Sequence, residues 1–169
     1  MDSNLIILKR DYLSIFKDLL DNYPAEACGI IIGDNLNLEN NLVRPCKNIQ
    51  DEMIKKSPEQ FSVNSSRRYY MDPKDIMNVF NEMADKKLEL VGLYHSHPDA
   101  DPYWSNEDHK SAMFADSDYP SYPLANNIVI SVRDGKIANG AIYIWDNSSK
   151  KFEKKITIDS NGIEKRELG

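Results

Sequence analysis

The sequence predicts an α/β domain built on a mixed β-sheet. Three segments place apolar side chains at helical spacing, and they alternate with short apolar runs rich in β-branched residues. Strands interleaved with helices favour helices that pack on the faces of one sheet. A length of 169 residues suits one hydrophobic core, so we expect a single domain over residues 1–169.

The N-terminal part of the chain predicts one helix and two strands. Residues 9–22 carry apolar side chains at helical spacing, and Pro24 ends that helix. Residues 27–33 form a short apolar run that predicts a buried strand. A turn at residues 34–35 then leads to a second strand near residues 42–46.

The middle of the chain predicts a loop and a second helix. Residues 48–60 are polar, so we expect a mobile loop there, followed by a short strand at residues 61–63. Asp72 is the expected N-cap of the next helix, with Pro73 at its first position. The apolar face of this helix is predicted to consist of Ile76, Met77, Phe80 and Met83.

The C-terminal part predicts four strands and a third helix. Residues 88–97 form a strand, and residues 105–115 a helix with Ser105 as its N-cap. Asp134-Gly135 is a hairpin signal between two of the later strands. Those later strands are predicted at residues 128–132, 137–145 and 152–158.

Composition and charge argue against two classes of partner. The net charge of -6 disfavours a nucleic-acid binder, because phosphate contacts need a basic surface. No apolar run approaches the ~20 residues that a membrane-spanning helix needs. Residues 1–4 lack the basic start of a signal peptide, so we expect a cytoplasmic protein that contacts neither nucleic acid nor membrane.

The two cysteines are too few and too isolated for a disulfide scaffold or a CxxC zinc site. Cys28 and Cys46 both fall in apolar stretches, so we interpret them as small buried hydrophobic residues. A disulfide between them stays open if their strands are neighbours, although it would be unusual in the cytosol of a mesophile.

A pair of histidines at the end of a predicted strand indicates a divalent metal site. His95 and His97 are two residues apart, so both side chains project from one face of the strand, with Cα atoms about 6.5 Å apart. Pro98 closes the strand and places the pair at the rim of the sheet. Asp108, in the first turn of the next helix, is the best candidate for a third ligand. Two histidines and one carboxylate leave a zinc ion an open position for water.

Each of these residues also has a structural interpretation. A histidine on a strand is more often structural than metal-binding, and a pair at alternate positions leaves the two interpretations about equal. Asp108 fits the acidic position of a capping box that begins at Ser105, and taken alone this interpretation is favoured. His109, the third histidine of the chain, has no spacing partner and is expected at the surface.

The complete pattern resembles the JAMM motif of the MPN-plus metalloproteases. That motif is a glutamate followed far downstream by H-[S/T]-H-P, six residues, and S-x-x-D. Here the residues from His95 read HSHP, six residues follow, and Ser105 and Asp108 complete the motif. Glu26 lies upstream in the segment EACGIIIG. The resemblance covers nearly the whole chain and is to the compact prokaryotic type of the family.

The resemblance implies a deaminase-like α/β/α sandwich with a central mixed β-sheet. It implies a Zn²⁺ ion bound by His95, His97 and Asp108. It also implies that Glu26 transfers protons and that Ser105 donates a hydrogen bond to the oxyanion. The structural alternatives are a solvated glutamate at Glu26 and a plain N-cap at Ser105.

The activity implied by the resemblance is hydrolysis of the peptide or isopeptide bond after a C-terminal Gly-Gly. The implied substrate and partner is a small β-grasp ubiquitin-like or sulfur-carrier protein, and the chain is expected to act as a monomer or homodimer. Residues 48–60 and 115–127 are short where larger relatives carry substrate-gripping insertions. The extra zinc-binding residues of some dedicated deubiquitinases are also missing, so specificity for polyubiquitin linkages is not carried over.

Two other functions are associated with this type of fold. A catalytically silent MPN-type scaffold that mediates protein assembly is the alternative, although silent relatives lose the histidines or the aspartate present here. A zinc nucleobase deaminase is rejected, because the H-x-E and P-C-x-x-C elements are absent. Tyr103 and Trp104 either wall a groove for a Gly-Gly tail or anchor the loop as a hydrophobic plug.

Overall fold

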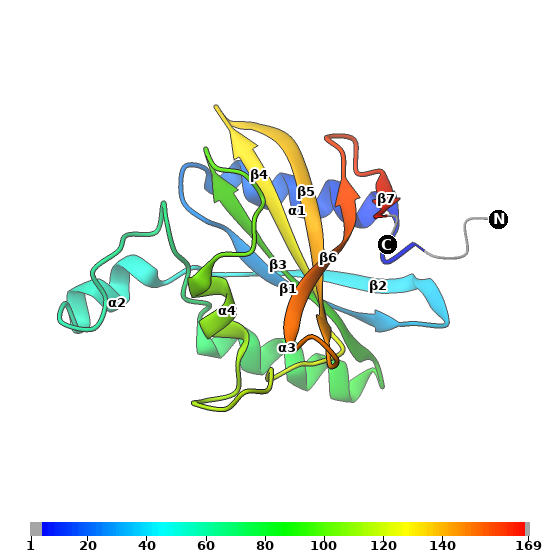
Figure 1. Cartoon of the computed structure of the whole chain (residues 1–169), viewed down its shortest axis with the longest axis horizontal. Coiled ribbons are helices and arrows are strands. Elements are labelled where there is room, and N and C mark those ends of the chain that lie inside the picture. The colour runs from blue at the N-terminus through cyan, green and yellow to red at the C-terminus, as the bar shows by residue number, and fades with distance from the viewer. Residues whose placement is uncertain (1–4, 168–169) are drawn as a thin grey trace.

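The computed structural model describes residues 5–167, which contain one mixed seven-stranded sheet (Figure 1). β3 and β4 run parallel, and the other neighbouring strands are antiparallel. In spatial order the strands are β2 (Asn37–Cys46), β1 (Cys28–Asp34), β3 (Glu89–Pro98), β4 (Asn126–Arg133), β5 (Lys136–Asp146), β6 (Lys151–Ile158) and β7 (Glu164–Arg166). The α/β class with a central mixed sheet is confirmed. The expectation about residues 1–4 lies outside the described residues.

Helices cover both faces of the sheet. The helices of the described residues are α1 (Lys9–Asn22), α2 (Gln50–Lys56), α3 (Pro73–Asp85) and α4 (Asn106–Ala112). Alternate residues of β4 show the two faces, because Ile128 and Ile130 pack in the cluster that contains α1, whereas Val129 packs in the cluster beside α4. α3 contributes Val79 to a third cluster with Ile30 and Ile32 of β1. The arrangement is therefore the predicted α/β/α sandwich.

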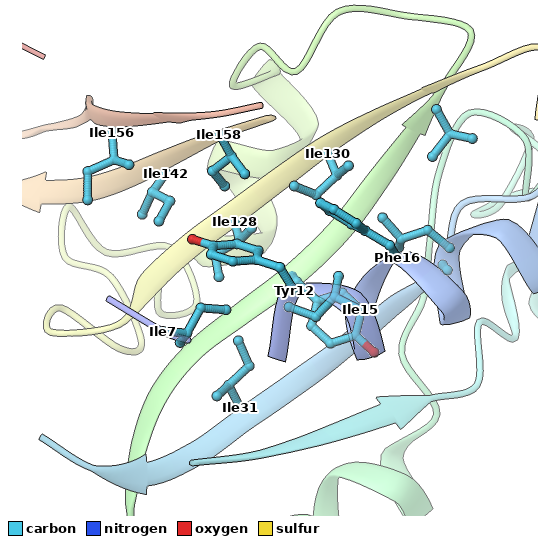
Figure 2. Packing of buried hydrophobic residues seen from close by; sticks show 14 of the residues in the cluster. Ile7, Tyr12, Ile15, Phe16, Ile31, Ile128, Ile130, Ile142, Ile156 and Ile158 are labelled. Atoms are coloured by element: carbon cyan, nitrogen blue, oxygen red, sulfur yellow. The ribbon is translucent and has the colours of Figure 1, made fainter. Parts of the chain in front are cut away.

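The main core lies between α1 and the sheet (Figure 2). Helical spacing puts the buried apolar side chains of α1 on one side of the helix, and burial of each contributes roughly 1.5–3 kcal/mol relative to exposure. From α1 these side chains are Tyr12, Ile15, Phe16 and Leu19. On the sheet their neighbours include Ile31, Ile128, Ile130, Ile142 and Ile156.

Strand direction brings the candidate site residues to one rim of the sheet. β1 is antiparallel to β3, so Cys28 at the start of β1 is the register partner of His95 near the end of β3. Glu26 lies two residues before Cys28 and therefore approaches the rim that carries the two histidines. Residues from far apart in the sequence meet there because of the sheet order.

Helix and turn signals from the sequence are confirmed at three places. α1 spans the predicted residues 9–22, and the Asp72 side chain caps α3 by accepting a hydrogen bond from Lys74 N. Asp134 and Gly135 have φ values of 50° and 71°, the left-handed backbone that a type I′ hairpin requires between β4 and β5.

The prediction of a loop at residues 48–60 is wrong for its central part, and the prediction of a short strand at residues 61–63 is wrong. Residues 50–56 form α2, and residues 61–63 are not in a strand. α2 buries only Gln50, so it lacks the apolar stripe that predicts a helix. Its acidic residues in the first turn and lysines in the last turn complement the helix dipole instead.

Smaller differences concern element ends and one helix face. Residues 37–41 extend β2 beyond the predicted start, and the short β7 was not predicted. α4 ends at Ala112 rather than at residue 115, because Met113 adopts an extended backbone with ψ of 144°. Met77 is 65% exposed, so it does not belong to the buried face of α3.

The two cysteines lie on neighbouring strands and are register partners, yet both are free and buried. The interpretation as small buried residues is confirmed, and Cys28 Sγ donates to the main-chain oxygen of Cys46 at 3.6 Å. In the part of the chain that the structure describes, no helix has the length and apolar character that a bilayer span needs.

Candidate metal centre

Three buried side chains converge where β3 ends and α4 begins. His95 Nε2 lies 3.1 Å from Asp108 Oδ1, and His97 Nε2 lies 3.3 Å from Asp108 Oδ2. The two histidine Nε2 atoms are 3.2 Å apart, and one ligand atom from each of the three residues lies within 4.8 Å of the others. The structure therefore brings together the three residues that the sequence singled out.

The donor set fits a zinc ion. Two imidazole nitrogens and one carboxylate are typical protein ligands of catalytic zinc, and they leave a fourth position open. All three side chains are buried, with exposed fractions of 4%, 6% and 7% for His95, His97 and Asp108. Burial alone would raise the pKa of Asp108, but His95 and His97 hold that pKa well below its usual range. The carboxylate is therefore ionised and ready to bind a cation.

Asp108 also completes the capping box of α4, so its structural and metal-binding interpretations do not exclude each other. Ser105 N donates to Asp108 Oδ2, and Asp108 N donates to Ser105 Oγ, both at 3.0 Å. The box fixes the side chain of Asp108 in the direction of the two histidines. The cap therefore orients the third candidate ligand.

A hydrogen bond fixes the tautomer of His97. Its Nδ1 lies 2.8 Å from the main-chain oxygen of Asp101. A carbonyl oxygen only accepts hydrogen bonds, so Nδ1 carries the proton and Nε2 keeps its lone pair for a metal. The sequence did not identify this acceptor, because it is a main-chain atom of the loop between β3 and α4.

Side chains from other elements hold that loop at four consecutive residues. The pairs are Tyr23–Asp99, Ser131–Ala100, Arg133–Asp101 and Tyr143–Pro102. Ser131 is fully buried and donates to the main-chain oxygen of Ala100 at 2.6 Å. The acceptor for His97 is therefore part of a rigid loop.

Glu26 lies in the same cleft with its carboxyl group almost completely buried. The residue is 6% exposed, and burial raises its pKa to about 7, against the opposing effect of His95 and His97. A pKa near neutrality suits a group that accepts and returns a proton at physiological pH. The interpretation of Glu26 as a solvated surface residue is wrong, because the residue is buried and lines the cleft.

The cleft has a volume of about 550 Å³. Its lining combines the candidate ligands His97 and Asp108 with polar and aromatic side chains: Glu26, Arg67, Arg68, Tyr69, Tyr103 and Ser105. Ser105 Oγ accepts the capping hydrogen bond from Asp108 N, and a hydroxyl can accept one bond while it donates another. Capping α4 and donating into the cleft are therefore compatible.

Tyr103 and Trp104 have different surroundings. Tyr103 is 55% exposed, lines the cleft, and makes an edge contact with His97 at a centroid distance of 5.0 Å. Trp104 packs against Tyr143 and Phe152, with centroid distances of 5.5 Å and 4.9 Å. Tyr103 is thus a wall of the cleft, whereas Trp104 anchors the loop as a hydrophobic plug.

Two residues of the cleft had no signal in the sequence. Tyr69 packs its ring against the imidazole of His95 at a centroid distance of 4.8 Å. Arg68 forms an ion pair with Glu107 of α4 at 2.9 Å. Both come from residues between the predicted strand at 61–63 and the N-cap Asp72, to which the sequence pattern assigned no element, and only the fold brings them to the site.

Comparison with known proteins identifies a family for most of the chain. Residues 9–134 match the family described as prokaryotic homologs of the JAB domain. This span contains Glu26, His95, His97, Ser105 and Asp108.

Two relatives are similar over part of their length. A desampylase of Haloferax volcanii is 28% identical over 91 residues, which are 54% of this chain and 57% of the relative. A desampylase of Pyrococcus furiosus is 25% identical over 103 residues, which are 61% of this chain and 63% of the relative. The chain therefore matches less than two thirds of the length of each relative.

Two solved structures share the fold. A protein from Desulfitobacterium hafniense has a TM-score of 0.59 at 21% identity, over 88% of this chain and 87% of its own. A protein from Salinibacter ruber has a TM-score of 0.53 at 24% identity, over 85% of this chain and 84% of its own.

Proposed function

Because the chain belongs to the prokaryotic homologs of the JAB domain, we propose that it is a zinc-dependent metalloprotease of the JAMM type. Its reaction is hydrolysis of the peptide or isopeptide bond after a C-terminal Gly-Gly. The substrate is a ubiquitin-like or sulfur-carrier protein, and the similarity to two desampylases supports this choice.

One observation carries this proposal. His95, His97 and Asp108 direct their ligand atoms to one point, and a buried glutamate lies in the same cleft. If His95, His97 and Asp108 were only structural, they would need no glutamate beside them. Burying a carboxyl group that has no hydrogen-bond partner also lowers the stability of the fold. The presence of Glu26 in such a place supports a catalytic use.

Each side chain of the site has a defined part in the proposed reaction. His95, His97 and Asp108 hold the zinc ion, which when bound supplies an activated water near neutral pH and polarises a carbonyl group. Glu26 accepts the proton from the attacking water and then returns it to the leaving amine. The hydroxyl of Ser105 donates a hydrogen bond to the developing oxyanion.

Tyr103 and Arg68 line the cleft from two segments far apart in the sequence, and we assign them to binding of the substrate tail. An extended Gly-Gly tail has no side chains, so it can enter a cleft that is narrowed by aromatic and polar side chains. Glycine at both positions also lets the scissile bond approach the buried ligands closely.

The test compares wild type with Glu26→Gln on a carrier protein joined through its C-terminal Gly-Gly to a lysine side chain or to cysteine. The variant should keep its zinc and hydrolyse the substrate at least about 100-fold more slowly, because it cannot accept a proton. A matched substrate that lacks the two glycines should be bound and cleaved less well by wild type.

Two results would overturn the proposal in different ways. Equal hydrolysis by wild type and Glu26→Gln would remove Glu26 from the mechanism. A zinc-loaded wild type that hydrolyses none of these substrates would favour the silent scaffold instead.

A further inference from the structure

Asn48, which follows the end of β2, uses its whole side-chain amide to join segments around Glu26. Its Nδ2 donates to the main-chain oxygens of Glu26 at 2.8 Å and Arg68 at 3.2 Å. Its Oδ1 accepts from the main-chain N–H groups of Gln50 and Tyr70, each at 3.0 Å. Two N–H groups and two lone pairs are the full capacity of an amide side chain, so every one of them is used on main-chain partners.

The main chain at Glu26 is held from both sides. Its N–H donates to the main-chain oxygen of Ser65 at 2.6 Å, and its own carbonyl accepts from Asn48. The next residue, Ala27, donates to Ser96 Oγ at 2.9 Å, and Ser96 lies between the two histidine ligands on β3. Glu26 precedes β1, so its main chain is not hydrogen-bonded to a neighbouring strand. Asn48 and Ser65 supply the main-chain hydrogen bonds in place of such a strand.

The segment that shares Asn48 with Glu26 is itself fixed. Residues 63–70 are bound to α2 by the Gln50 side chain, which donates to main chain at 2.8 Å, and by the Asp51 carboxylate, which accepts from main chain at 2.9 Å. Figure 1 shows that α2 projects away from the sheet, and these contacts help to connect it to the site. The same segment presents Tyr69 to the ring of His95.

We propose that Asn48 is a positioning residue that holds Glu26 in the orientation required for proton transfer. The inference rests on the proposed function, because it assigns Glu26 the proton transfer. A shift of about 1 Å in a reacting group can lower a rate by about 100-fold. Loss of the Asn48 amide should therefore lower kcat while the zinc ligands, on β3 and α4, stay in place.

The test compares Asn48→Ala with Gln50→Ala. Both variants remove an amide that anchors residues 63–70, but only Asn48 also bonds to Glu26, so Gln50→Ala is the matched control. We expect Asn48→Ala to keep its zinc, to lower kcat by about 10- to 100-fold and to change KM by less than about 2-fold. Gln50→Ala should keep kcat within about 3-fold of wild type.

A second measurement and a second variant separate positioning from unfolding. Amide hydrogen exchange at Glu26 and Ala27 should become faster in Asn48→Ala, while exchange in the α1 and β3 cores stays unchanged. Asn48→Asp keeps the acceptor for Gln50 and Tyr70 but removes both donors, so it should show the same loss of kcat in a fully folded protein.

The outcomes distinguish this inference from the proposed function. If Glu26→Gln is inactive but Asn48→Ala and Asn48→Asp both keep the kcat of wild type, the assignment of Asn48 is wrong and the proposed function stands. Equal losses in Asn48→Ala and Gln50→Ala, or a loss carried by KM, would also overturn it. Full activity of Glu26→Gln would instead remove the proposed function on which the inference rests.

Discussion

In the proposed mechanism, the position that suits Glu26 for proton transfer also costs the protein stability. Its carboxyl group is buried beside two histidines and an aspartate, and burial raises its pKa to about 7. In the unfolded chain the same group titrates at its ordinary value near 4.5. The folded protein therefore binds this proton more tightly than the unfolded chain does.

This difference predicts a pH-dependent stability that Glu26→Gln abolishes. A folded pKa above the unfolded one means that the metal-free wild type loses stability as the pH rises from about 4.5 to about 7. At pH 8 metal-free Glu26→Gln should be more stable than wild type by roughly 1–3 kcal/mol, and the gap should shrink at pH 5. Denaturant unfolding at the two pH values measures this difference.

An exposed carboxyl gives the matched control. Glu59→Gln, at the surface, should leave the free energy of unfolding unchanged at both pH values. A wild type that is as stable as Glu26→Gln at pH 8 would show that the Glu26 carboxylate is not buried in solution.

The sequence predicted the three candidate ligands, but it did not predict the groups that surround them. His95, His97 and Asp108 follow from strand alternation and motif spacing, which are local properties of the sequence. The acceptor for His97 is a main-chain oxygen, and the amide of Asn48 acts on main chain, so neither leaves a pattern in side-chain identity.

At the scale of elements, the N-terminus of α4 has an observed structural role, and the proposed function adds a chemical one. Ser105 caps the helix through Oγ, and the same hydroxyl keeps a proton that it can donate into the cleft. The cap also fixes Asp108 beside the histidines. A change at Ser105 should therefore be visible in both stability and catalysis.

We expect Ser105→Ala to lower the free energy of unfolding by about 1 kcal/mol, the usual effect of losing an N-cap. It should also lower kcat by about 100-fold, because an oxyanion donor is lost. Ser105→Thr keeps the hydroxyl and should stay near wild type in both. Unfolding curves and steady-state kinetics well below the melting temperature measure the two effects. An unchanged kcat in Ser105→Ala would show that Ser105 only caps α4 and takes no part in catalysis.

Elements with a strong local signal were predicted correctly, and the others depend on tertiary contacts. α1 and β3 have clear hydrophobic periodicity, and α3 has a complete N-cap signal in Asp72 and Pro73. α2 buries only Gln50, and the three residues of β7 pair with β6 at the edge of the sheet. Whether polar segments such as these form a helix or a strand depends on tertiary contacts, which the local sequence does not reveal.

At the scale of the whole molecule, the sheet order creates the site. Antiparallel pairing of β1 with β3 brings the glutamate of one segment to the histidines of another, and α4 adds the aspartate over the same rim. The fold class followed from alternating helix and strand patterns. The strand order and the contacts of residues 63–70 did not, because they depend on pairing between distant segments.

The metal content of the purified protein tests the central claim most directly. After equilibration with zinc and removal of the excess, elemental mass spectrometry should find about one zinc ion per wild-type chain and almost none in His97→Ala. His109→Ala is the control and should keep its zinc, since His109 packs against Phe152 and is not one of the three converging residues. A wild type without zinc, or His97→Ala with as much zinc as wild type, would contradict the account.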